Sequence, residues 1–159
     1  MGKWIAPVSL SGTLEDNLAA VAAARFDGIE LFDSDLVVSD LSPDQVRGRC
    51  ADLGLDIELF QPLRDVEGCA PEDFPRVLRR VRQKFALMEQ LGAVVTLACS
   101  SVSSAAIDDV DPSAEQLSPL GDVAAELGFL IAPPAVAWGR ASNRGGPAGG
   151  AVNRDHAPP

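Results

Sequence analysis

Short apolar runs alternate with longer segments of helical periodicity along the first 132 residues. Apolar residues recur at every third or fourth position in the longer segments, which is typical of amphipathic helices. The clearest helix is expected at 74–91, where apolar residues alternate with arginines. The apolar runs are expected strands, at residues 4–10, 28–32, 56–61, 94–99 and 129–132. Such strands separated by helices indicate a parallel α/β sheet covered on both faces.

Local signals mark where several of these elements begin and end. Residues 42–45 (Ser-Pro-Asp-Gln) form a capping box with proline at the first helical position, and Gly54 is the expected left-handed stop. Thr13 is the expected cap of an earlier helix. Residues 33–35 (Asp-Ser-Asp) are interpreted as the polar exit of the second strand. A further helix is expected at 112–127.

The third strand passes directly into a charged loop. Pro62 follows the strand and is expected to end it, because proline locks its own φ and lacks an N–H. Arg64, Asp65 and Glu67 come next, in a loop from 62 to about 71 that is longer than most connections. Functional residues of α/β proteins gather where strands end in loops. The sequence therefore predicts that this loop carries function.

Two architectures fit this order of elements: a doubly wound open sheet, or part of a (β/α)₈ barrel. Neither a G-x-G-x-x-G fingerprint nor a P-loop occurs, which disfavours nucleotide-binding folds. A complete barrel needs roughly 250 residues. If the chain is part of such a barrel, residues 1–140 form about five of its β/α units, and about three are absent. Residues 141–159 are rich in glycine, alanine, proline and arginine, and their composition predicts a disordered tail.

Composition narrows the classes of partner and compartment. The net charge of −10 argues against nucleic acid and anionic membranes as partners. No apolar run approaches the ~18 residues of a membrane span, and the first residues lack a signal-peptide pattern. Cys50, Cys69 and Cys99 match no zinc spacing and suit a reducing compartment. We therefore expect a cytoplasmic protein.

Several stretches resemble bacterial 3-dehydroshikimate dehydratases. They are DGIELFDSDL at 27–36, CADLGLDIELFQPLRDVEGC at 50–69, VTLACSSV at 95–102 and AVAWGR at 135–140. FQPLRDVEG and AWGR are fairly specific to the dehydratases. DGIEL is shared across the sugar phosphate isomerase/epimerase superfamily of xylose isomerase-like barrels, to which these enzymes belong. The resemblance runs from about residue 5 to residue 140.

The resemblance implies a metal-dependent enzyme that converts 3-dehydroshikimate to protocatechuate in aromatic catabolism. A divalent ion, Mn²⁺, Mg²⁺ or Co²⁺, would sit at the strand ends. By the same resemblance, Arg64 would bind the substrate carboxylate, with pairing to Asp65 or Glu67 as the alternative. Glu30 would face the pocket, with a structural role as the alternative. Ser100 and Ser101 are candidate hydrogen-bond donors to substrate at the end of the fourth strand, with an ordinary loop role as the alternative.

The chain departs from the family at the metal site. Family members carry a metal-binding glutamate on the fifth strand, where this chain has Pro134, which has no side-chain donor atom. His156, the only histidine, lies outside every matched motif. We therefore expect this chain to bind no metal and to be inactive alone. We also hypothesise that residues 141–159 are an out-of-frame or broken gene end.

Two other functions remain open at this point. The superfamily motifs also allow an isomerase or epimerase that acts on a sugar. The chain is alternatively a non-enzymatic barrel remnant. A partial barrel would expose sheet edges and apolar surface, which favours self-association.

Overall fold

The computed structural model describes residues 2–132 apart from 100, 102, 104–105 and 108–109, and at 110–112 it describes the backbone alone. Its strands are β1 (Trp4–Ile5), β2 (Gly28–Phe32), β3 (Asp56–Gln61), β4 (Leu63–Arg64), β5 (Val95–Cys99) and β6 (Leu130–Ala132). Its α-helices are α1 (Leu14–Ala23), α2 (Asp33–Val38), α3 (Pro43–Asp52), α4 (Phe74–Leu91) and α5 (Val110–Leu127). The predicted tail at 141–159 lies outside the described residues.

The chain divides into two compact units. The first comprises residues 1–62 and 86–95, and the second comprises residues 63–85 and the chain from 96 onward. Helix α4 and strand β5 each contribute residues to both units. None of the described helices combines the length and apolarity needed to cross a membrane.

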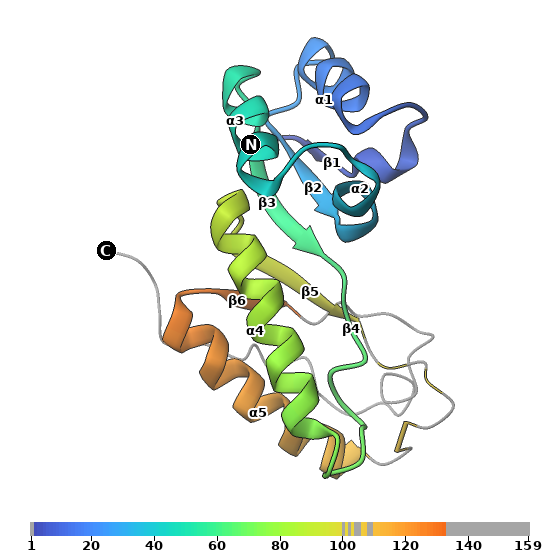
Figure 1. The fold of residues 1–159 in the computed structure, drawn as a ribbon, viewed down its shortest axis with the longest axis vertical. Coiled ribbons are helices and arrows are strands. Elements are labelled where there is room, and N and C mark those ends of the chain that lie inside the picture. Colours follow the sequence, from blue (N-terminus) through green and yellow to red (C-terminus); the bar gives the residue numbers. More distant parts are fainter. Residues whose placement is uncertain (1, 100, 102, 104–105, 108–109, 133–159) are drawn as a thin grey trace. The chain divides into compact units, whose positions relative to one another are not determined.

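The first unit contains a parallel sheet in the order β1-β2-β3-β5, as the pattern predicted (Figure 1). Trp4 pairs with Gly28, Gly28 with Asp56, and Leu59 with Val95 at the start of β5. A Cβ atom at Gly28 would overlap the carbonyl oxygen of Asp56 and the indole of Trp4. Glycine at this position therefore lets the first three strands approach one another closely.

The core of the first unit follows from the helical and strand periodicities. Its fully buried side chains come from α1, β2, α3, β3 and the end of α4; they include Leu18, Val21, Ile29, Leu31, Val46, Phe60 and Met88. The α3 capping box is present, because Ser42 Oγ accepts from the Gln45 amide at 3.3 Å and Gln45 Oε1 accepts from the Ser42 amide at 2.8 Å. Gly54 adopts φ +69° at the end of this helix, as expected.

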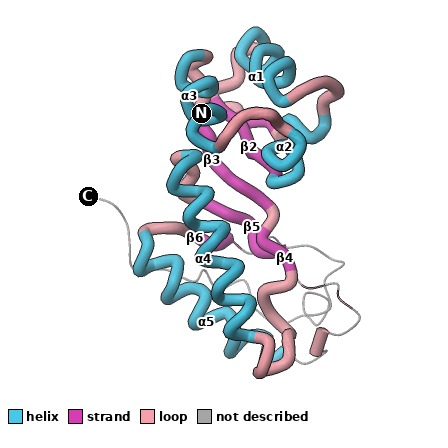
Figure 2. Tube along the Cα trace, viewed as in Figure 1, coloured by secondary structure: helices cyan, strands magenta, loops and turns pink. Residues whose placement is uncertain are grey.

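The second unit contains β4, most of β5, and β6, together with α5 and the first part of α4 (Figure 2). Leu63 and Arg64 of β4 pair in parallel with Ala98 and Cys99 of β5, and β6 also pairs with β5. The rings of Phe85 and Phe129 stack with centroids 5.0 Å apart, which joins α4 to the segment before β6.

Three local predictions were wrong. The strand expected at 4–10 is two residues long, because Pro7 begins a 3₁₀ turn in which the Leu10 amide donates to the Pro7 carbonyl at 2.8 Å. Residues 33–35 begin helix α2 instead of a loop. The loop expected from Pro62 contains β4, because the chain pairs again immediately after the proline.

The sheet is also less covered than predicted. In β3, Asp56 and Glu58 are exposed while Ile57 and Leu59 are buried, so the first half of this strand alternates. This alternation is typical of a strand with one solvated face.

Candidate functional site

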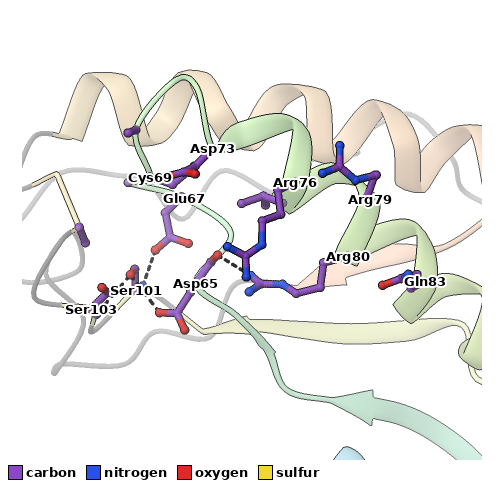
Figure 3. A pocket seen from close by; sticks show the side chains of 14 residues that line it. Asp65, Glu67, Cys69, Asp73, Arg76, Arg79, Arg80, Gln83, Ser101 and Ser103 are labelled. Carbon is purple, nitrogen blue, oxygen red and sulfur yellow. Dashed lines mark hydrogen bonds between the residues drawn. The ribbon is translucent and has the colours of Figure 1, made fainter.

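A pocket of about 620 Å³ lies in the second unit (Figure 3). Three segments line it: the loop that follows β4, the N-terminal half of α4, and the stretch that follows β5. The charged side chains among the lining residues are Asp65, Glu67, Asp73, Arg76, Arg79 and Arg80. Cavities of this size accommodate small molecules.

Ser101 joins the two carboxylates on one side of the pocket. Its backbone amide donates to Glu67 Oε1 at 2.6 Å, and its hydroxyl donates to Asp65 Oδ1 at 3.0 Å (Figure 3). Asp65 adopts φ +50°, a left-handed conformation that aspartate tolerates better than most residues. This backbone turn and the two hydrogen bonds fix both carboxylates in the pocket wall.

Glu67 is a buried acid with a perturbed pKa. Its side chain is 7 % exposed, and burial raises its pKa above the ordinary value. The hydrogen bond from the Ser101 amide opposes this rise, whereas the charge of Asp65 adds to it. Perturbed carboxyl groups in a cavity are candidates for functional groups.

Arg80 holds the backbone of the same loop. Its Nη2 atom donates to the carbonyl oxygen of Arg64 at 2.6 Å and to that of Asp65 at 2.5 Å. Arg80 lies in the second turn of α4. Its charge-assisted hydrogen bonds satisfy two backbone carbonyl groups of the loop. The arginines of α4 are exposed, whereas Lys84 on the same helix is buried.

Two further contacts anchor the loop at its far end. The Ile107 amide donates to the Gly68 carbonyl at 2.7 Å, and the Gln116 side chain exchanges hydrogen bonds with the backbone of Cys69. Gly68 adopts φ +69°, which favours glycine there. The stretch from Asp65 to Cys69 is therefore bonded along its length to the segments after β5.

The predicted site residues fall in different surroundings. Arg64 is exposed on β4, and its side chain is not among those that line the pocket. No ion pair within the described part of the chain joins Arg64 to Asp65 or Glu67, the alternative partners considered for it. Glu30 is half-buried on β2 and accepts a hydrogen bond from Gln61 Nε2 at 3.0 Å. Ser100 lies outside the described residues, and substrate roles for all three stay predictions.

The sequence named Ser101 as a candidate hydrogen-bond donor and Glu67 as an alternative partner of Arg64, but it did not predict that Ser101 donates to Glu67 or that Arg80 binds the loop. Glu67 and Ser101 are 34 positions apart, so no local pattern connects them. The signal that could have pointed to them is the motif itself, because the acids of the RDVEG segment precede an unusually long connection.

No group of three or more His, Cys, Asp or Glu side chains within the described part of the chain could hold a metal ion. The described residues therefore do not fit the metal site that the resemblance implies. Pro134 and His156 lie outside the described residues. Cys50, Cys69 and Cys99 are free thiols in the structure.

The described fold matches part of the xylose isomerase-like TIM barrels. A xylose isomerase-like TIM barrel/4-hydroxyphenylpyruvate dioxygenase fusion protein gives a TM-score of 0.85 at 48% identity, over 88% of this chain and 22% of that protein. The IolI protein with a bound zinc atom gives a TM-score of 0.68 at 16% identity, over 84% of this chain and 51% of its own. The second likeness shows the fold alone. The α/β architecture predicted from the sequence, a partial TIM barrel, is confirmed.

Within this class of barrels, the sequence is homologous to 3-dehydroshikimate dehydratases. The enzyme of Pseudomonas aeruginosa is 50% identical over 143 residues, which cover 90% of this chain and 23% of that enzyme. The enzyme of Pseudomonas putida is 48% identical over 143 residues, which cover 90% of this chain and 22% of that enzyme. The chain thus spans less than a quarter of these relatives. No family model matches the sequence.

Proposed function

We propose that this chain is part of the barrel of a 3-dehydroshikimate dehydratase, which removes water from 3-dehydroshikimate to give protocatechuate. The identity of 48–50% over 143 residues to two such enzymes carries the proposal. The anchored loop with the FQPLRDVEG motif supports it, because this motif is the most specific part of the resemblance. Sugar epimerases such as D-psicose 3-epimerase share the fold at 15% identity. This likeness concerns the fold alone and does not support a sugar as the substrate.

We further propose that the chain alone does not turn over this substrate. Its described residues bring together no metal-binding cluster, and Pro134 replaces the family's glutamate ligand with a residue that lacks a donor atom. A metal-assisted reaction would need ligands from residues other than those described, or from another chain. Zinc bound to IolI illustrates metal binding in this class of barrels without locating a site in this chain.

The direct test is a dehydratase assay on the purified chain. Protocatechuate absorbance is followed from 3-dehydroshikimate with Mn²⁺, Mg²⁺ or Co²⁺ added, and with a chelator as control. The intact Pseudomonas aeruginosa enzyme serves as the positive control. We expect turnover by that enzyme and none by the chain, whereas chelator-sensitive turnover by the chain would refute the proposed inactivity.

A chimera tests two questions separately: whether the chain is part of a dehydratase, and whether Pro134 prevents metal binding. Residues 5–140 of this chain replace the aligned segment of the Pseudomonas aeruginosa enzyme, with Pro134 kept or with the substitution Pro134→Glu. We expect the Pro134→Glu chimera to dehydrate 3-dehydroshikimate more than about tenfold faster, since even supporting residues of a metal site contribute 10–100-fold. Equal rates would reject the role of position 134. A folded Pro134→Glu chimera that acts on keto-sugars instead would reject the dehydratase assignment.

A further inference from the structure

Two arginines converge on the pocket of the second unit. Arg76 and Arg80 lie one helical turn apart on α4, and their side chains point toward each other beside Asp65 (Figure 3). Arg79 also lines the pocket, but in Figure 3 its side chain points away from them. Like charges at this helical spacing repel each other, so the arrangement costs stability unless an anion offsets it.

No carboxylate among the described residues lies within ion-pair distance of either guanidinium group. The guanidinium of Arg80 donates to two neutral carbonyl oxygens, of Arg64 and Asp65. The side chain of Arg76 makes no ion pair or hydrogen bond with any residue that the structure describes. Of the acids that line the pocket, Asp65 and Glu67 accept hydrogen bonds from Ser101. Two guanidinium groups with free donors therefore face one cavity.

Two carboxyl groups in the same pocket restrict which anion fits. Asp65 and Glu67 present carboxyl oxygens to the same cavity. A phosphate dianion would be repelled by these groups, whereas hydroxyl groups could donate hydrogen bonds to them. A ligand with one carboxylate and several hydroxyl groups can pair with the two arginines and donate hydrogen bonds to the two acids. Arginine forks bind carboxylates with paired parallel hydrogen bonds.

We propose that this pocket binds a small hydroxylated monocarboxylate, with the carboxylate on Arg76 and Arg80 and the hydroxyls on Asp65 and Glu67. The ligand class rests in part on the proposed function, because 3-dehydroshikimate is a cyclic hydroxy acid. The proposal moves carboxylate recognition from Arg64, whose side chain does not line the pocket, to α4. A cavity of about 620 Å³ has room for such a ring.

Isothermal titration of the full chain with shikimate tests this, in the presence of a chelator so that neither metal nor turnover contributes. We expect Arg76→Gln to weaken binding about tenfold or more, the loss typical of a hydrogen bond to a charged group. Arg76→Lys should lose less. Arg82→Gln is the matched control, with the same change of charge on the same helix but outside the pocket lining, and should bind as the unaltered chain does. Thermal melting checks that each variant is folded.

Ligand comparisons complete the experiment. Inorganic phosphate should bind more weakly than shikimate because it carries more negative charge. Cyclohex-1-ene-carboxylate should also bind more weakly because it has no hydroxyl groups. The proposal fails if shikimate does not bind or if phosphate binds equally well. It also fails if Arg76→Gln and Arg82→Gln weaken binding equally, or if Arg64→Gln alone abolishes binding. Arg76-dependent binding together with an inactive chimera would reject the proposed function and retain this site. Dehydration by the chimera without Arg76-dependent binding would retain the proposed function and reject this site.

Discussion

The buried carboxyl group of Glu67 makes a prediction about pH at the scale of a single residue. Burial raises its pKa in the folded chain above the ordinary value of 4.5. Its contribution to stability is therefore fully present below about pH 4.5 and is lost as the pH rises through the pKa of the folded chain. Glu67→Gln cannot ionise and keeps an acceptor for the Ser101 amide. We expect the stability of this variant, relative to the unaltered chain, to increase from about pH 5 to about pH 8.

Urea unfolding at several pH values measures this difference. Glu72→Gln, at an exposed position in the same loop, is the matched control and should show a smaller change with pH. A constant difference between Glu67→Gln and the unaltered chain across the range would mean that Glu67 does not titrate as its burial implies.

Single residues show where sequence reasoning succeeds and where it stops. The motif that contains Arg64, Asp65 and Glu67 was recognised as functional from its position after a strand. The hydrogen bonds that organise it come from Ser101 and Arg80, which are distant in sequence. Helical periodicity identifies the exposed face that carries Arg80, but it does not reveal that a loop folds back onto that face. Such contacts depend on tertiary structure and were not predictable from local pattern.

Helix α3 provides a prediction at the scale of an element. Ser42 Oγ accepts the Gln45 amide, and Gln45 Oε1 accepts the Ser42 amide, so each side chain satisfies a backbone donor at the helix start. Ser42→Ala should lower the free energy of unfolding by about 1 kcal/mol. Ser11→Ala, at an exposed position with no hydrogen bond to its side chain among the described residues, is the control and should change it little. Equal losses in the two variants would argue against the cap.

Long elements were predicted well because their patterns repeat. Helix α4 spans Phe74–Leu91 as expected, since its apolar residues keep helical spacing over eighteen positions. Strands β1 and β4 have two residues each, too few for any period, and they exist because neighbouring strands pair with them. Helix α2 was missed because its first residues, Asp33 to Asp35, have the composition of a turn.

For the whole molecule, the order of the elements was more predictable than the way they group into compact units. Five apolar runs with intervening helices predicted a parallel sheet, either open or part of a barrel, and the chain covers 51% of the solved IolI barrel. The two-unit division was not predicted, because α4 and β5 are continuous in sequence while their residues belong to both units. Periodicity describes each element, whereas the grouping of elements depends on contacts between distant residues.

Self-association is the prediction that belongs to the whole molecule. Val37 and Val38 are 82% and 81% exposed, and β1 pairs only with β2 among the described strands. Exposed apolar side chains and free strand edges favour association, whereas the net charge of −10 opposes it and is screened by salt. We expect light scattering to give a mass above 16.6 kDa that rises with protein concentration and with salt.

A double variant shows whether the exposed valines drive that association. Val37→Ser with Val38→Ser removes apolar surface without changing charge, so the apparent mass should fall toward 16.6 kDa at each concentration. Ala51→Ser, at another exposed position, is the control and should leave the association unchanged. If the double variant associates as strongly as the unaltered chain, the free edge of β1 becomes the better candidate, because backbone pairing does not depend on these side chains. A mass that stays at 16.6 kDa at all concentrations would reject both contacts.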